Sequence, residues 1–138
     1  MTRMLDTDIC IYTIKRKPAV VFKRMEKMAP GMLFMSAITF AELVNGAQKS
    51  RYVKDNLRRL NTLSELIEVL VFDKKAALTY GSVRSNLERR GLVIGANDLL
   101  IAAHALSLNM TLVTNNEKEF SRVNGLKIEN WIENSETS

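Results

Sequence analysis

Short apolar runs alternate along the chain with longer stretches in which apolar residues recur every three or four positions. The runs predict strands at residues 3–8, 32–37, 68–72, 110–113 and 127–129, the last of them an edge strand. The periodic stretches predict helices that begin near residues 8, 18, 39, 50, 73, 97 and 117. Strands that alternate with helices indicate an α/β fold, in which a mostly parallel central sheet carries helices on both faces.

The totals indicate one globular domain. With 138 residues, 46% of them hydrophobic and 25% charged, the chain is long enough and apolar enough for one core. We place the domain at residues 1–133 and a polar tail at residues 134–138. No apolar stretch has the length of a membrane span, and the N-terminus lacks a signal peptide's apolar region. We therefore expect a cytoplasmic protein without membrane association.

Positive charge is concentrated in the first part of the chain. Residues 1–60 hold twelve Lys and Arg against five Asp and Glu, whereas residues 61–138 hold eight against ten. An enzyme that acts on a polyanion needs cations to hold phosphates, so the asymmetry favours a nucleic-acid partner, although a solvated surface explains any single Lys better. The candidate phosphate contacts are Lys15, Arg16, Lys49, Arg51 and Arg84.

Carboxylates stand where the apolar, strand-like runs end. Asp6 and Asp8 close the first run, Glu42 follows the second, and Asp98 opens the apolar helix of residues 97–108. The carboxyl ends of parallel strands face the ligand crevice of an α/β protein, so we expect these groups to gather there. Like charges at close range repel, and Mg²⁺ or Mn²⁺ prefers carboxylate oxygens, so the pattern indicates a metal site. A single Cys and a single His nearly exclude a zinc site built from those residue types.

Each acid also has a structural interpretation. Asp8 can cap the helix that follows it, which explains the residue as well as a ligand role does. Glu42 and Thr39 have the spacing of a capping box, and taken alone this is the stronger explanation. Asp98 suits the first turn of a helix, where the dipole favours a carboxylate. The metal hypothesis therefore rests on these acids together with Asp6.

The fourth predicted strand also ends in polar residues. Asn116 at this end could bring a neutral oxygen ligand or a hydrogen-bond donor for phosphate to the site. Thr114 and Glu117 have the spacing of a second capping box, and Glu119 has no place that the sequence assigns. His104 lies on a strongly apolar helix, where packing and a hydrogen bond explain a histidine more simply than a role as general base.

Four motifs and a closing tripeptide carry a resemblance to a known family. They are residues 4–12 (MLDTDICIY), 41–47 (AELVNGA), 98–105 (DLLIAAHA), 112–120 (LVTNNEKEF) and Glu129-Asn130-Trp131. Together they resemble a PIN-domain ribonuclease, and more narrowly the VapC-type toxins of bacterial toxin–antitoxin modules. The resemblance runs from about residue 4 to residue 131. It is specific as a combination, because each motif alone is weak.

The resemblance implies a PIN-like three-layer sandwich that cleaves RNA with Mg²⁺ or Mn²⁺. It implies Asp6, Glu42 and Asp98 as the metal-binding and catalytic acids. Position at the strand ends adds Asn116 as a further catalytic candidate and Asp8 as a further metal candidate. The resemblance also implies a homodimer and a small inhibitory antitoxin of the VapB type. The members that the chain resembles most cut initiator tRNA in the anticodon stem-loop, so this RNA is the implied substrate.

Two positions depart from the family's pattern. The family usually has Asn where this chain has Asp8, and the added carboxylate could tighten metal binding or disturb the ligand geometry. Many PIN domains have an Asp where this chain has Asn116, so a second metal ion would be held weakly.

Two other functions stay open at this point. Asp6 and Asp8 form an Asp-x-Asp pattern after a first strand, which also resembles haloacid-dehalogenase phosphatases, although the lysine and late acidic pair of that family have no convincing match here. A catalytically silent RNA-binding module is the non-enzymatic alternative. Cleavage of intact tRNA with and without EDTA separates both from a metal-dependent nuclease.

Overall fold

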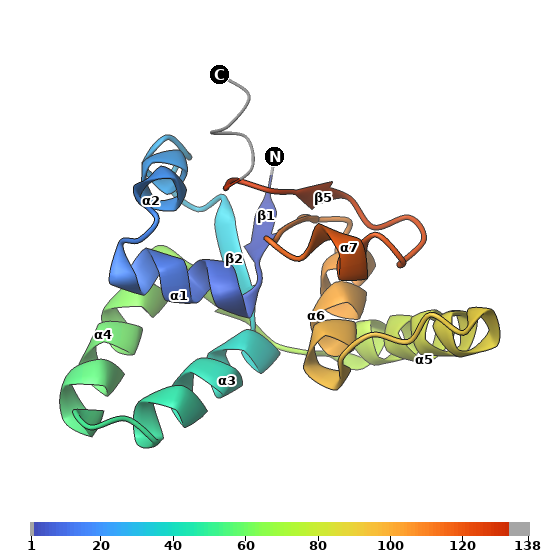
Figure 1. Cartoon of the computed structure of the whole chain (residues 1–138), viewed down its shortest axis with the longest axis horizontal. Helices are drawn as coiled ribbons and strands as arrows, with labels where there is room; N and C mark the ends of the chain where they lie inside the picture. Colours follow the sequence, from blue (N-terminus) through green and yellow to red (C-terminus); the bar gives the residue numbers. More distant parts are fainter. Residues whose placement is uncertain (1, 133–138) are drawn as a thin grey trace.

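The computed structural model describes residues 2–132, and within them the chain forms five strands and seven helices (Figure 1). The strands are β1 (Arg3–Leu5), β2 (Leu33–Ser36), β3 (Glu68–Leu70), β4 (Thr111–Val113) and β5 (Ile128–Glu129). The helices are α1 (Thr7–Lys15), α2 (Ala19–Glu26), α3 (Ala37–Gln48), α4 (Val53–Leu66), α5 (Lys74–Arg90), α6 (Ala96–Ser107) and α7 (Glu117–Phe120). The tail predicted at residues 134–138 lies outside the described residues. None of these seven helices is long and apolar enough to cross a membrane.

The order of the strands leaves a crevice at the middle of the sheet. All paired strands are parallel, and their order is β3-β2-β1-β4-β5. The chain builds outward from β1 as far as β3 and then returns to place β4 on the other side of β1. The register pairs Leu5 with Val113, so β1 and β4 end side by side. Such a reversal opens a crevice outside the carboxyl ends of the two central strands, where α/β proteins bind ligands.

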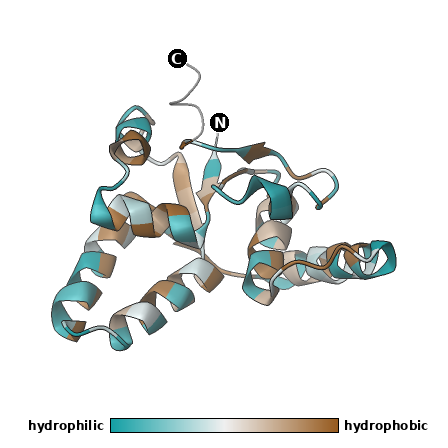
Figure 2. Cartoon of the chain, in the orientation of Figure 1, coloured by the Kyte–Doolittle hydropathy of each residue, from teal (hydrophilic) through white to brown (hydrophobic). Residues whose placement is uncertain are grey.

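Successive residues of the central strands point to opposite faces of the sheet, and helices cover both faces. Leu5 and Val113 belong to the core that α1–α4 form, whereas Met4 and Leu112 belong to the core that α5–α7 form. All four side chains are fully buried, as is typical of parallel sheets. Figure 1 shows the sheet between the two groups of helices, and Figure 2 shows polar residues on the outer end of α5 and along α4. The α/β prediction is confirmed.

Side chains at the strand ends begin two of the helices. Asp6 caps α1, because its Oδ1 accepts a hydrogen bond from the Ile9 N–H at 3.0 Å. Asp8 lies in the first turn of that helix, so the prediction that Asp8 is the cap is wrong. Ser36 caps α3 by accepting a hydrogen bond from the Ile38 N–H at 3.1 Å. Strand, cap and helix therefore follow one another without a loop at both places.

Neither of the two predicted capping boxes forms. Thr39 lies inside α3, three residues after the cap, which puts Glu42 in the second turn of the helix instead of the first. At α7 the cap position is Asn116, and the hydroxyl of Thr114 accepts a hydrogen bond from the Asn116 N–H at 2.9 Å. Helix capping therefore does not explain Glu42.

The remaining predicted boundaries are right within a few residues. Asp73 caps α5 and Gly91 ends it in the left-handed conformation with φ of 67°, as the sequence predicts. The first strand ends at Leu5 instead of residue 8, because the next residue already caps a helix. The helix predicted from residue 50 begins at Val53.

Candidate acidic site at the carboxyl ends of the central strands

Asp6 is the innermost acid of the crevice. It follows β1 directly and is 4% exposed. Its carboxylate accepts hydrogen bonds from the Ile9 N–H and from the Thr114 hydroxyl at the end of β4. Burial raises the pKa of Asp6 to about 7, and the charges of Asp8 and Asp98 act in the same direction. Ionised Asp6 is therefore destabilised in its own site, as is common for functional carboxylates.

Asp98 reaches the same crevice from the first turn of α6 and is half-buried. Burial raises its pKa to about 6, and the charges of Glu119, Glu42 and Asp8 raise it further. Gly95 caps the helix, and a Cβ there would lie 3.6 Å from Asp98 Oδ2 and 3.4 Å from Glu119 Oε1. Gly95 therefore lies directly against both carboxylates.

Glu42 comes from α3, yet hydrogen bonds tie it to two other helices. The Thr7 hydroxyl donates to Glu42 Oε1 at 2.5 Å, and the Asn97 side chain donates to Glu42 Oε2 at 3.1 Å. Thr7 is the neighbour of Asp6, and Asn97 is the neighbour of Asp98. The structure therefore brings the three acids predicted from the sequence into one electrostatically coupled group.

Glu119, which the sequence did not place, joins this group from α7. Glu119 Oε1 accepts a hydrogen bond from the Gly95 N–H at 2.6 Å, and Glu119 Oε2 accepts one from the Asn116 side chain. The sequence does contain a signal for Glu119. It lies three positions after Asn116, which the sequence places at the end of the fourth strand, and residues three apart in a helix share a face. We name Asp6, Glu42, Asp98 and Glu119 the acidic site.

Two further candidates lie at the edge of the acidic site. Asp8 is exposed in the first turn of α1, and its charge raises the pKa of both Asp6 and Asp98. Asn116 is half-buried and points its amide nitrogen at Glu119. His104 is fully buried instead, with Nδ1 2.8 Å from Ser36 Oγ and its ring edge-on to Phe72, as expected for a packed histidine.

The five predicted phosphate contacts do not gather at the acidic site. Lys15 and Arg16 lie at the end of α1 far from Asp6, and Lys49 and Arg51 follow the last turn of α3. Arg84 lies on α5, where it donates hydrogen bonds to Glu88 and Tyr80. Lys15 does line a small hollow together with Glu42. The roles of all five residues stay predictions.

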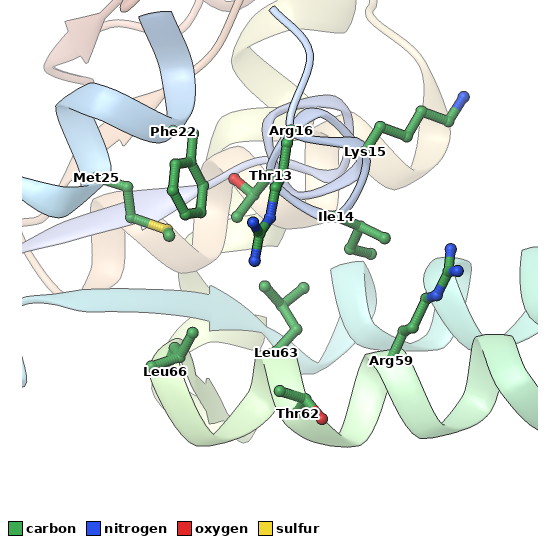
Figure 3. A pocket seen from close by; sticks show the side chains of 10 residues that line it. All are labelled: Thr13, Ile14, Lys15, Arg16, Phe22, Met25, Arg59, Thr62, Leu63 and Leu66. Atoms are coloured by element: carbon green, nitrogen blue, oxygen red, sulfur yellow. The ribbon is translucent and has the colours of Figure 1, made fainter. Parts of the chain in front are cut away.

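A pocket of about 420 Å³ opens elsewhere, between the ends of α1, α2 and α4 (Figure 3). Its lining combines mostly apolar side chains with three cations, Lys15, Arg16 and Arg59. The other lining residues are Thr13, Ile14, Phe22, Met25, Thr62, Leu63 and Leu66. No member of the acidic site lines it. A smaller hollow of about 240 Å³ between α1, α3 and α4 does include Glu42 in its lining, together with Lys15 and Arg59.

The donor set of the acidic site suits a hard divalent cation. All four side chains offer carboxylate oxygens, and their mutual charges favour a cation among them. In residues 2–132, however, no three Asp, Glu, His or Cys side chains lie at metal-binding spacing as they stand. The chemistry of the ligands therefore fits Mg²⁺ or Mn²⁺, whereas their present separation requires the carboxylates to move closer together around it.

Comparison with known families identifies the class of protein. Residues 3–126 match the family model of the PIN domain. The chain belongs to the PIN-domain family, in agreement with its motifs and with the α/β architecture.

Individual relatives narrow this assignment to the VapC group. Ribonuclease VapC2 of Rickettsia felis is 43% identical over 132 residues, which cover 95% of this chain and 98% of the relative. The tRNA(fMet)-specific endonuclease VapC of Shigella flexneri is 44% identical over 128 residues, or 93% of this chain and 96% of the relative. This chain also superposes on a chain of a solved structure, the crystal structure of VapBC2 from Rickettsia felis bound to a DNA fragment from their promoter. The TM-score is 0.88 at 42% identity, and the match covers 95% of this chain and 99% of the solved chain. The resemblance to VapC proteins is confirmed over nearly the full length.

Proposed function

We propose that the chain is the toxin of a toxin–antitoxin module and acts as a metal-dependent endoribonuclease. The single observation that carries the chemistry is the acidic site, where the end of β1 and the helices α3, α6 and α7 bring carboxylates together, and where burial and neighbouring acids raise the pKa of Asp6 and Asp98. The names of the two relatives, a ribonuclease and a tRNA endonuclease, support the same reaction at more than 40% identity.

Asp6, Glu42, Asp98 and Glu119 would hold Mg²⁺ or Mn²⁺. Such an ion supplies positive charge that offsets the charge developing on the scissile phosphate and makes water a better nucleophile. The chain contributes the positions of the acids: Asp6 is fixed by the Ile9 N–H, and Glu119 by the Gly95 N–H. Hydrolysis then leaves a 5′-phosphate and a 3′-hydroxyl.

Initiator tRNA, cut in the anticodon stem-loop, is the substrate that we propose. The relative from Shigella flexneri carries that specificity in its name. An unpaired loop also suits a site on an α/β scaffold, because RNA is read in sequence where its bases are unstacked.

The proposed partner is a small antitoxin of the VapB type, since the solved relative from Rickettsia felis is a VapBC complex. A cluster of uncompensated carboxylates attracts a guanidinium, which pairs with a carboxylate in a bidentate manner. An antitoxin Arg placed at the acidic site would therefore compete with the metal ion. A homodimer, which the resemblance implies, stays a prediction.

The test is an assay of intact initiator tRNA, compared with elongator tRNAs, in Mn²⁺ and in EDTA. We expect one cut in initiator tRNA that needs the metal and is absent from Asp98→Asn. Binding of tRNA without any cut in Mn²⁺ would favour the silent RNA-binding module. A trapped aspartyl-phosphate on Asp6 would favour the phosphatase, which neither the PIN-domain match nor the role of Asp6 as a helix cap supports.

A further inference from the structure

Glu42 is the acid of the site that has the least support from its own helix. Asp6 caps α1 and Asp98 lies in the first turn of α6, so the main chain fixes both near a helix start. Glu42 instead lies in the second turn of α3 and has a longer side chain, with one more rotatable bond than Asp. Ordering such a side chain costs conformational entropy, so contacts from outside the helix have to hold it.

Those contacts are one hydrogen bond to each oxygen. Thr7 Oγ1 lies 2.5 Å from Glu42 Oε1, and Asn97 Nδ2 lies 3.1 Å from Glu42 Oε2. Thr7 Oγ1 also lies 3.3 Å from Thr39 Oγ1. Thr7 has one hydroxyl hydrogen and the ionised carboxylate can only accept, so Thr7 donates to Glu42 while the buried Thr39 donates to Thr7. The chain of donors thus runs from the core outward to the carboxylate.

The donors are immediate neighbours of the other acids. Thr7 follows Asp6, and Asn97 precedes Asp98. A carboxylate has about four lone-pair positions, so two hydrogen bonds leave both oxygens of Glu42 able to accept a further ligand. The pair of bonds therefore ties the Glu42 carboxylate to the chain neighbours of both aspartates without using up its capacity to bind a cation.

We infer that Thr7 and Asn97 are positioning residues, which orient the Glu42 carboxylate beside the chain neighbours of Asp6 and Asp98 and so shorten the movement that brings these acids together around a divalent cation. This inference rests on the proposed function of the acidic site. It assigns no contact with RNA or metal to Thr7 or Asn97 themselves. Their effect on binding passes through the orientation of the Glu42 carboxylate, as outer partners of metal ligands commonly act.

The experiment measures binding of Mn²⁺ alone to the full chain without RNA, by calorimetry and by loss of the free-ion electron paramagnetic resonance signal. The variants are Thr7→Val, which keeps the shape and loses the hydroxyl, Thr7→Ser, which keeps the hydroxyl, and Asn97→Ala. Asn61→Ala, an exposed asparagine on α4, is the matched control. Thermal melting without metal accompanies each titration.

We expect Thr7→Val and Asn97→Ala to weaken Mn²⁺ binding by about ten-fold each, with melting temperatures near that of the wild type. Thr7→Ser and Asn61→Ala should bind as the wild type does. Unchanged affinity in both Thr7→Val and Asn97→Ala would overturn the positioning role and leave the proposed function intact. Affinity lost in parallel with the melting temperature would overturn it as well, in favour of general destabilisation. Absence of saturable binding to the wild type would remove the proposed metal site and this inference with it.

Discussion

Two carboxylates that end strands of the same sheet have opposite surroundings. Glu129 ends β5 and accepts hydrogen bonds from Arg3 Nε at 3.1 Å, from an Arg24 guanidinium nitrogen at 3.1 Å and from Trp131 Nε1 at 2.6 Å. Asp6 follows β1 and is more deeply buried, and the charged groups that act on it are other acids. Glu129 is therefore compensated inside the fold, whereas Asp6 is not.

The difference shows how a structural acid can be told from a functional one. A position at the carboxyl end of a strand is common to both residues, so position alone does not separate them. The sign of the surrounding charge does, because a fold gains nothing from gathering like charges unless a ligand later joins them. The guanidinium of Arg24 also lies over the ring of Trp131. Arg24 therefore connects α2 to the edge of the sheet through both Glu129 and Trp131.

The largest expected effect is a loss of tRNA cleavage when an acid of the acidic site is changed, in contrast to a change at Glu129. Asp98→Asn removes a charge from the acidic site, so we expect tRNA cleavage to fall by roughly 1,000-fold, the size of loss seen when a main electrostatic group of an active site is removed. The melting temperature without metal should hold or rise, because repulsion is relieved.

The matched variant in the compensated region is Glu129→Gln. It removes the negative charge of Glu129 from Arg3 and Arg24, so we expect the free energy of unfolding to fall by about 1–2 kcal/mol, a moderate value because all three side chains are partly exposed. Cleavage per folded molecule should stay within about two-fold of the wild type. The comparison fails if Glu129→Gln loses cleavage while Asp98→Asn loses stability.

The next effect is the contribution of Asp6 to the pH dependence of the free energy of unfolding. The pKa of Asp6 is about 7 in the folded protein against 3.8 in the unfolded chain. Asp6 therefore binds its proton more strongly in the folded state than in the unfolded chain. The stabilisation that this proton provides is complete below about pH 4 and is lost as the pH rises to about 7. Asp6→Asn should remove this loss and exceed the wild type in metal-free stability at pH 8, by at most about 4 kcal/mol at about 1.4 kcal/mol per pKa unit.

The measurement is urea unfolding of the metal-free protein between pH 4 and pH 8. Asp55→Asn, on the exposed face of α4, is the control and should differ from the wild type by a small amount at pH 8. Equal stability of Asp6→Asn and the wild type at pH 8 would show that Asp6 is compensated after all.

The sequence predicted the part of the site that local patterns determine. Asp6 and Asp98 each stand where an apolar run meets a helix start, and that junction is visible in one stretch of chain. The α/β order of the strands and the start of α5 at Asp73 are local in the same sense, because hydrophobic period and capping chemistry define them.

Contacts between distant segments could not be predicted in this way. Glu42 looked like a helix-cap residue until its partners Thr7 and Asn97, 35 and 55 residues away, were known. Glu119 was left unassigned because its partner Gly95 belongs to another loop. The placement of the basic residues is not local either: Lys15 lines a hollow with Glu42, whereas Arg84 pairs with Glu88 on α5. The direction in which a helix runs follows from packing, which composition does not contain.

The next prediction tests whether Asn116, where many PIN domains have Asp, weakens the binding of Mn²⁺ to the acidic site. Asn116 donates to Glu119, so Asn116→Asp sets a second carboxylate against it. We expect lower metal-free stability and Mn²⁺ binding that is roughly ten-fold tighter, because the charge of the ligands sets the affinity of oxygen sites. Thermal melting over a Mn²⁺ series measures both. Asn116→Ala, which removes the donor without adding charge, should bind no tighter than the wild type, and tighter binding in both variants would contradict the charge argument.

The smallest effect concerns Asp8, the exposed acid at the margin of the uncompensated region. Asp6 is the cap of α1, so Asp8→Asn should leave the helix and the melting temperature nearly unchanged. The loss of a charge that raises the pKa of Asp6 and Asp98 should weaken Mn²⁺ binding by about two- to three-fold at low salt, since an exposed charge acts through solvent. At about 0.5 M salt the difference should shrink, because the screening length then falls below about 5 Å. A difference that persists at high salt would instead mean that Asp8 contacts the metal directly, and would extend the acidic site to five carboxylates.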